Sequence, residues 1–244
     1  MSSEIDYTSS HKMEGKGICY DEHYENDPWR KFLWSREQLV LLDILNTYFQ
    51  NREINLLDFA CGTGRVAGFL ENLVAVSVGV DVSDSMLEAA KKKLTKTELI
   101  KADITKEKVF AGRKFNLITA FRFFLNAEPE LRKSALGALL PLLEKDGYFI
   151  FNNHRNSTSP LVRFKYSRRR RKRNFMSMDE MYSIAGEFGL EIVKIYPVGF
   201  LTLPKIKLPQ ICYRWPDNAA AKFKCLQSYS ESPIAVCKYS GIKV

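Results

Sequence analysis

Apolar residues recur along the chain in two alternating patterns, which predict buried strands separated by amphipathic helices. Short, largely apolar runs predict strands over 54–59, 75–80, 98–101, 115–120, 148–152, 191–198 and 232–239. Apolar positions at helical spacing predict helices over 35–49, 65–73, 84–94, 129–143 and 177–188. Strands that alternate with helices favour an α/β domain built on a largely parallel sheet.

Capping residues set the expected helix boundaries. Ser35 and Gln38 fit a capping box, so we expect the first helix to begin there. Ser177 and Glu180 fit a second capping box, and Gly189 is a typical helix end.

The stretch from Leu56 to Arg65 is the centre of this pattern. An apolar strand breaks there into Gly62 and Gly64, and a helix follows. Glycine tolerates positive φ and has no Cβ, so such a turn brings backbone close to a nucleotide-like ligand. Gly62, Gly64 and Ala67 also fit the loose dinucleotide fingerprint, which alone is weak evidence.

Asp58, near the end of the strand, argues against a bound pyrophosphate, because like charges repel. A cationic ligand would be attracted instead. The sequence Asp-x-Ala-Cys-Gly-Thr-Gly, which starts at Asp58, resembles motif I of the class I S-adenosylmethionine (SAM) methyltransferases, whose cofactor carries an ammonium and a sulfonium. We therefore favour this family over the nicotinamide-dependent dehydrogenases.

Two further motifs extend the resemblance. Asp81 closes the second predicted strand and could accept both ribose hydroxyls, while Val82 and Met86 after it would line the adenine slot. Asp103 resembles the acid of the third motif, which accepts from the adenine amino group. The resemblance implies that SAM, released as S-adenosylhomocysteine (SAH), is bound by Asp58, Ala60, Gly62, Gly64, Asp81, Val82, Met86, Ala102, Asp103, Ile104 and Phe121.

The resemblance also implies a fold. It is the Rossmann-like class I methyltransferase fold, a seven-stranded, mostly parallel sheet in the order 3-2-1-4-5-7-6, with strand 7 antiparallel and helices on both faces. We expect a flexible tail over 1–18 and one domain over 19–244. Within that domain we expect an N-terminal lid or helices over 19–52, a basic loop over 153–176 and an insertion over 201–230.

The N-terminal segment is rich in aromatic and charged side chains. It could fold as a lid over the cofactor, as in many small-molecule methyltransferases, or form a helix edge that covers the core. These residues are Tyr20, Asp21, His23, Tyr24, Trp29, Arg30, Phe32 and Trp34.

Residues for the methyl acceptor are expected after the strands at 115–120 and 148–152. Arg122 could pair with an anionic substrate or form a surface salt bridge. His154 could be a general base for a hydroxyl, since imidazole titrates near neutral pH, or a solvated loop residue. His23 is a weaker candidate base. The chain lacks the Asn/Asp-Pro-Pro-aromatic and Pro-Cys motifs of nucleic-acid adenine and cytosine-C5 methyltransferases.

The formal net charge of +9 is concentrated in six consecutive basic residues, Arg168–Arg173. This run could be a solvated loop, contact RNA phosphates, or bind an anionic substrate, an acyl carrier or a membrane surface. No aromatic residues interrupt it, as they would in an RNA-stacking platform.

The five cysteines are scattered and include no Cys-x-x-Cys pair, so neither a disulfide framework nor a metal site is expected. Cys61, within the glycine turn, is interpreted as a packing residue. The chain has no apolar run of about eighteen residues and its first residues do not resemble a signal peptide, so we expect a cytoplasmic protein.

The sequence thus predicts a SAM-dependent methyltransferase that acts on a small-molecule or glycan-type acceptor, which could be anionic, most readily at oxygen. The alternatives are an RNA methyltransferase that uses Arg168–Arg173, a non-catalytic SAM-binding partner subunit, and a nicotinamide-dependent enzyme. The sequence does not predict an oligomeric state.

Overall fold

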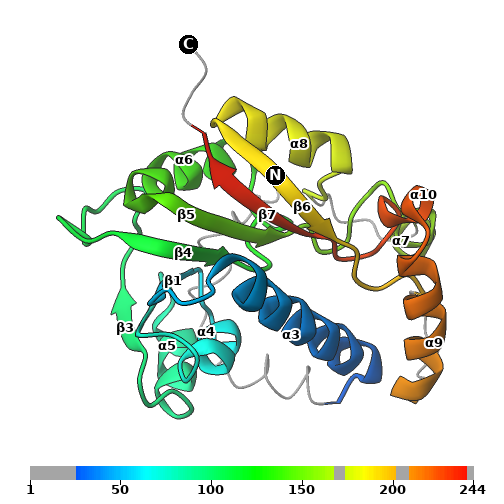
Figure 1. Ribbon diagram of the computed structural model, residues 1–244, viewed down its shortest axis with the longest axis horizontal. Coiled ribbons are helices and arrows are strands. Elements are labelled where there is room, and N and C mark those ends of the chain that lie inside the picture. The colour runs from blue at the N-terminus through cyan, green and yellow to red at the C-terminus, as the bar shows by residue number, and fades with distance from the viewer. Residues whose placement is uncertain (1–25, 168–173, 202–208, 241–244) are drawn as a thin grey trace, which may run out of the picture.

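The computed structural model describes residues 26–167, 174–201 and 209–240. One seven-stranded sheet, in the order β3-β2-β1-β4-β5-β7-β6, forms its centre (Figure 1). Strand β7 is antiparallel to β5 and β6, and the other pairs are parallel, which confirms the predicted topology. The strands are β1 Asn55–Phe59, β2 Val76–Asp81, β3 Glu98–Lys101, β4 Phe115–Ala120, β5 Leu143–Asn152, β6 Leu190–Tyr196 and β7 Ile234–Tyr239.

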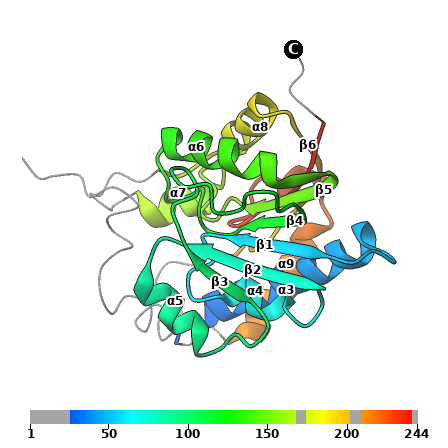
Figure 2. The same ribbon diagram turned by 90° about the vertical axis from the view of Figure 1, so that its left-hand side faces the viewer.

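Helices cover both faces of the sheet. Figure 2 shows α6 and α8 on one face, with α3, α4 and α5 on the other. The helices are α3 Pro28–Tyr48, α4 Arg65–Leu70, α5 Asp84–Lys91, α6 Pro129–Leu139, η1 Leu140–Leu142, α7 Pro160–Tyr166, α8 Met178–Glu187, α9 Gln210–Ala221 and α10 Lys224–Gln227.

The core consists of two clusters, one on each face of the sheet. Adjacent strand residues such as Leu56 and Leu57 point to opposite clusters because side chains alternate along a strand. Both are fully buried, which explains why the inner strands are continuous apolar runs rather than alternating ones. Burial of one such leucine contributes about 1.5–3 kcal/mol. The same rigid sheet positions the loops that follow its strands.

The predicted start of the first helix at Ser35 was wrong, because the helix begins seven residues earlier. Helix α3 starts at Pro28, and the Asp27 carboxylate caps it by accepting from the backbone N–H of Trp29 at 3.0 Å. Ser35 lies within the helix, where its hydroxyl donates to the carbonyl of Phe32 at 2.8 Å. An aspartate followed by a proline is itself a typical helix start.

Two residues in the described part of the aromatic segment cover the core. Trp29 and Phe32 of α3 are buried and pack against Tyr213 of α9, with ring centroids 4.9 and 5.6 Å from the tyrosine ring. These two residues therefore fit the alternative in which the segment forms a helix edge that covers the core. The other proposed lid residues, Tyr20, Asp21, His23 and Tyr24, and the predicted tail lie outside the described residues.

The C-terminal half contains more helix than predicted. Helix α7 occupies part of the predicted basic loop, and α9 and α10 occupy most of the predicted insertion. Strand β5 begins at Leu143 rather than at 148. The capping box of Ser177 and Glu180 is confirmed, with both reciprocal hydrogen bonds present. Arg168–Arg173 and residues 202–208 lie outside the described residues.

No helix in the described ranges combines the length and apolar character needed to span a bilayer.

Candidate active site

The carboxyl ends of three neighbouring strands carry residues with strained backbones. Ala60 follows β1 with φ +53°, Arg122 follows β4 with φ +63°, and Arg155 lies beyond β5 with φ +62°. Left-handed conformations are costly for residues with a Cβ, and such strain concentrates at functional sites. The three residues therefore mark one edge of the sheet as the candidate site.

The two glycines of the turn after β1 serve different purposes. Gly62 has φ +57°, and a Cβ built on it would meet no atom within 4 Å, so this glycine faces open space. Gly64 has φ +74°, and its Cβ would lie 2.6 Å from the Leu94 Cδ1. Gly62 thus leaves room for a ligand, whereas Gly64 allows close packing against the segment after α5.

Asp58 is buried at the end of β1, and two donors from neighbouring elements fix its carboxylate. The backbone N–H of Ala67 in the first turn of α4 donates to Oδ2 at 3.1 Å, and the Thr119 hydroxyl donates to Oδ1 at 2.7 Å. Burial raises the pKa of Asp58 to about 7, although these hydrogen bonds act in the opposite direction. A nearby cation would favour the ionised form.

Asp81, at the end of β2, connects that strand to the glycine turn. Its Oδ2 accepts from the backbone N–H of Gly62 at 2.8 Å, and its Oδ1 accepts from the N–H of Ser83 at 2.9 Å. The turn is therefore held by the same carboxylate that the sequence assigned to the ribose.

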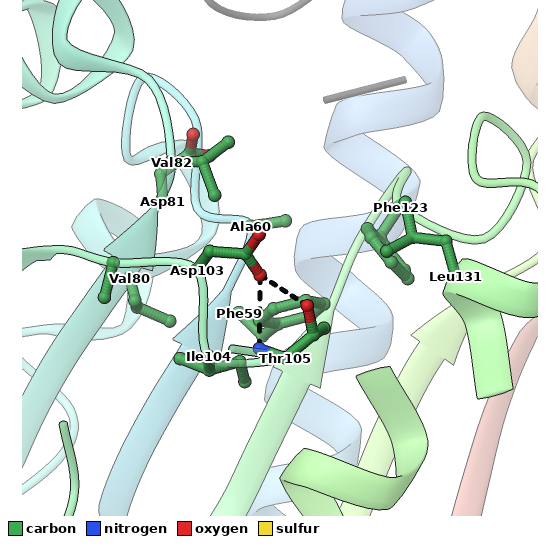
Figure 3. A pocket seen from close by; sticks show the side chains of 11 residues that line it. Phe59, Ala60, Val80, Asp81, Val82, Asp103, Ile104, Thr105, Phe123 and Leu131 are labelled. Atoms are coloured by element: carbon green, nitrogen blue, oxygen red, sulfur yellow. Dashed lines mark hydrogen bonds between the residues drawn. The ribbon is translucent and has the colours of Figure 1, made fainter. Parts of the chain in front are cut away.

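Two pockets adjoin at this edge, and Ala60 and Asp81 line both of them. The first, the apolar pocket, is lined by Phe59, Ala60, Val80, Asp81, Val82, Ala102, Asp103, Ile104, Thr105, Phe123 and Leu131 (Figure 3). The second, the turn pocket, is lined by Asp58, Ala60, Cys61, Gly62, Thr63, Arg65, Val66, Asp81, Met86, Phe121, Arg122 and Asn126. One elongated ligand with an apolar end and a charged end would fit the pair.

Asp103 lies in the apolar pocket with Thr105 as its neighbour (Figure 3). The backbone N–H and hydroxyl of Thr105 donate to Oδ1 at 3.2 and 2.6 Å, and Lys106 Nζ lies 3.1 Å from Oδ2. Burial alone would raise the pKa of Asp103, but these contacts outweigh it and lower the pKa. Both oxygens thus already have donors, with which an adenine amino group would compete.

Cys61 is buried in the turn with its Sγ against Gly79, where a Cβ would lie 3.0 Å from it. Burial and the nearby carboxylates of Asp58 and Asp81 raise the pKa of the thiol well above its ordinary value. A thiol that stays protonated is a packing group, as predicted.

Arg122 lines the turn pocket and forms a buried ion pair instead of the surface salt bridge that the sequence left open. Its Nη2 lies 3.1 Å from Glu37 Oε2, and its backbone N–H donates to Asn152 Oδ1 at 2.6 Å. Asn152 and Ser232 also donate to Glu37, each at 3.3 Å. This network joins α3 to the ends of β4 and β5.

Sequence reasoning missed Glu37. The side chain is fully buried, and burial raises its pKa to about 7, against the opposing influence of Arg65 and of its hydrogen bonds. The sequence does contain a pattern that could have identified Glu37. Leu33, Glu37 and Leu41 occupy one helix face at i, i+4 spacing. A charged residue on an otherwise apolar face needs a buried partner.

His154 does not fit the premise of a base poised near neutral pH. It is buried and lines neither pocket. Burial lowers its pKa well below the ordinary value, and the charges of Arg122, Arg155, Lys165 and Arg30 lower it further. The imidazole is therefore neutral at physiological pH, which corrects the expectation that it titrates there.

The structure gathers most of the predicted cofactor residues at one site. All of them line one of the two pockets except Gly64, which supports the turn by packing. Val82 and Met86, expected together in one slot, face different pockets: Val82 the apolar pocket and Met86 the turn pocket.

Residues 56–147, which span the turn and both pockets, match a family model described as a methyltransferase domain. This part of the chain is a methyltransferase domain, and its motifs resemble those of the class I SAM-dependent methyltransferase family. Its resemblance to the family therefore covers the acidic strand ends and the glycine turn, where the predicted cofactor residues lie.

Curated relatives agree with this family. A malonyl-[acyl-carrier protein] O-methyltransferase from Priestia megaterium is 28% identical over 185 residues, which cover 69% of this chain and 65% of that protein. A putative methyltransferase from Geobacillus sp. is 28% identical over 135 residues, or 52% of this chain and 50% of that protein. The chain thus spans about half to two thirds of the length of these relatives.

A solved structure shows the same fold. The magnesium protoporphyrin IX methyltransferase from Synechocystis PCC 6803, crystallised with bound SAH, superposes with a TM-score of 0.63 at 13% sequence identity. The match covers 93% of this chain and 95% of that one.

Proposed function

We propose that this protein transfers a methyl group from SAM to an oxygen atom of a small-molecule or glycan-type acceptor. The proposal rests on one observation above all: an apolar pocket and a pocket lined by a buried carboxylate adjoin and share Ala60 and Asp81. SAM has matching parts, an apolar adenine at one end, a ribose between, and a cationic amino acid part at the other.

The residues present fit this cofactor. Val82, Ala102 and Ile104 supply apolar contacts for adenine, and Asp81 lies where the two pockets meet and can accept from hydroxyls. Gly62 leaves open space in the turn pocket, where Asp58 offers a carboxylate to a cation. Bound SAM would supply an activated methyl group on a positively charged sulfur.

The chain itself would contribute orientation and exclusion of water. Methyl transfer needs the acceptor atom aligned with the methyl carbon and sulfur. Phe121 and Arg122 line the turn pocket at the end of β4, so they would face the acceptor side of the cofactor. Ion pairing with Glu37 fixes the Arg122 guanidinium before any ligand binds, which reduces the ordering cost of binding.

Transfer to oxygen is supported by the relative from Priestia megaterium, which is an O-methyltransferase. The low pKa of His154 argues against a histidine general base in the ligand-free protein. A carboxylate or another ionised oxygen is nucleophilic without such a base, so an acceptor of this kind suits the site best.

The test combines binding and labelling. Titration calorimetry should detect binding of SAM and SAH but not of NADH, and SAM should raise the melting temperature because it binds only the native state. SAM with a labelled methyl group is then incubated with host extracts divided into RNA, protein, and small-molecule plus glycolipid pools. Label in the last pool supports the proposal. Label in RNA makes Arg168–Arg173 the candidate recognition element and overturns the choice of acceptor, and SAM binding without label in any pool supports a non-catalytic subunit.

A further inference from the structure

The loop after β5 carries a buried histidine and a strained arginine that the cofactor site does not use. His154 and Arg155 lie between Asn153 and Asn156, whose side chains are both fully buried. Asn153 Nδ2 donates to the carbonyl of Met176 at 2.9 Å, and Asn156 Nδ2 donates to the carbonyls of Ser228 and Ser230 at 2.8 and 3.0 Å.

Backbone hydrogen bonds fix this loop at the same two residues, Asn153 and Asn156. The N–H of Asn153 donates to the carbonyl of Pro233 at 2.9 Å, and the N–H of Asn156 donates to that of Glu231 at 3.0 Å. His154 and Arg155 are therefore held between two anchored residues, and the left-handed φ of Arg155 is sustained by these anchors. Fixed geometry of this kind is typical of binding sites.

Positive charge surrounds the histidine. Arg122, Arg155, Lys165 and Arg30 all act electrostatically on His154. Three of these cations have acidic neighbours: Arg122 pairs with Glu37, Lys165 Nζ lies 3.9 Å from Glu231 Oε2, and Arg30 pairs with Asp27.

Arg155 differs from the other cations of this group. Its guanidinium lies 5.1 Å from the centroid of the Tyr166 ring, and no carboxylate in the described part of the chain pairs with it. Its Nε atom is buried without a hydrogen-bond partner among the described residues, and the same holds for His154 Nδ1. Two buried nitrogens on consecutive residues, each able to donate, thus lack a hydrogen-bond partner within the described part of the chain.

Buried donor atoms beside a guanidinium that has no carboxylate partner among the described residues favour a bound anion. We propose that His154 and Arg155 form an anion-binding subsite that holds a carboxylate or phosphate of the methyl acceptor, with Lys165 at its side. The inference rests on the proposed function and specifies the acceptor class. The neutral imidazole donates one N–H and the Arg155 guanidinium supplies the charge; both oxyanions accept such bonds.

The location agrees with an acceptor role. Asn152, the last residue of β5, accepts from the backbone N–H of Arg122, which lines the turn pocket, and His154 lies two residues beyond it in the following loop. An acceptor anchored there by its anion would extend toward Arg122 and Phe121. Because the anchoring group is separate from the cofactor residues, it would select acceptors without affecting SAM binding.

The test follows His154 directly by NMR, in the full chain saturated with SAH. The chain has three histidines, so a His154→Gln variant assigns the resonance. Malonate and inorganic phosphate are titrated separately, with uncharged dimethyl malonate as the control ligand. We expect malonate, phosphate or both to shift the His154 ring resonances saturably and to raise the pKa of His154, because an anion stabilises the imidazolium. A response to malonate alone identifies a carboxylate subsite, and a response to phosphate alone a phosphate subsite.

Matched variants separate this subsite from general surface charge. Arg155→Gln should weaken binding of the effective anion at least tenfold, and Lys165→Gln should weaken it several-fold. Arg163→Gln, an exposed arginine two residues before Lys165 on α7, should leave it unchanged. If Arg155→Gln does not fold, Arg155→Lys, which keeps the positive charge, replaces it in the binding measurement.

Three results overturn the inference: no response to either anion, an equal response to dimethyl malonate, or undiminished anion binding by Arg155→Gln. Calorimetry with SAH on the same samples distinguishes failure of the subsite inference from failure of the proposed function. A protein that fails to bind SAH overturns the proposed function itself, whereas one that binds SAH but no anion overturns only the subsite.

Discussion

At the scale of single residues, the site is defined by acidic side chains whose oxygens already have protein donors. Asp58 accepts from the first turn of α4 and from Thr119, and Asp81 accepts from the glycine turn. The same carboxylates thus fix the glycine turn and the start of α4 relative to the strands. Preorganisation of this kind reduces the ordering cost of binding.

The two glycines of the turn should respond differently to alanine. Gly62→Ala should reduce stability by only about 1 kcal/mol, since the added Cβ meets no atom and only the left-handed backbone is strained. Gly64→Ala should cost about 2–4 kcal/mol, because a clash with Leu94 adds to that strain. Urea denaturation measures both values. SAM affinity should fall more for Gly62→Ala, and the opposite ranking of the two variants in affinity would contradict the assignment.

Asp81 and Asp103 should contribute unequally to SAM affinity. Asp81→Ala removes the acceptor shared by both pockets and the bond to Gly62, so SAM binding should weaken by about tenfold to a hundredfold. Asp103→Ala should weaken it less, since both Asp103 oxygens already accept from Thr105 or Lys106. Calorimetric titration with SAH compares the two variants, and a larger loss for Asp103→Ala would show that adenine displaces these donors.

At the scale of elements, helix α3 connects the core to the turn pocket. Its N-terminal aromatics pack against α9, and its Glu37 pairs with Arg122 at the end of β4. This helix thus supplies both hydrophobic packing and a buried acidic side chain at the candidate site. The early start of the helix matters here, because it brings Trp29 and Phe32 into the core.

Stability measurements on two variants test where α3 begins. Asp27→Ala should destabilise the protein by about 1 kcal/mol, because it removes the acceptor for the first backbone N–H groups of the helix. Ser35→Ala should have little effect, since that hydroxyl donates to a carbonyl inside the helix. If Ser35→Ala were the more damaging substitution, the helix would begin at the capping box after all.

At the scale of the whole molecule, burial of charged groups ties folding to pH. Asp58 and Glu37 have pKa values raised from ordinary values of 3.8 and 4.5 to about 7. Between about pH 4 and pH 7 the folded state therefore holds more protons on these carboxyls than the unfolded state, so their contribution to stability falls as pH rises. His154, with a lowered pKa, acts in the opposite direction below about pH 6.5, but it is a single group.

We therefore expect the SAM-free protein to be less stable at pH 8 than at pH 5, by on the order of a few kcal/mol. Asp58→Asn and Glu37→Gln should each flatten this dependence, whereas Glu53→Gln, at an exposed position, should not. Chemical denaturation at the two pH values gives the difference directly. A constant or rising stability across this range would show that neither carboxyl is protonated in the fold.

The resemblance to a known family supplied the strand order and the candidate cofactor residues. The sequence by itself determined the strand segments, the glycine turn and the acids at strand ends. These features are local: an apolar run, two glycines and acids at strand ends are visible without knowledge of distant contacts. The Asp27–Pro28 helix start is equally local, although the prediction placed the start of the helix at Ser35.

Only the tertiary structure decided the roles of Glu37, Arg122 and His154. Glu37 contacts a residue 85 positions away, and His154 owes its low pKa to burial and to cations from other parts of the chain. Burial and electrostatic interactions depend on distances in space, which the order of residues does not reveal. In the folded protein His154, a candidate general base in the sequence, is therefore a neutral, buried imidazole next to Arg155 in the chain.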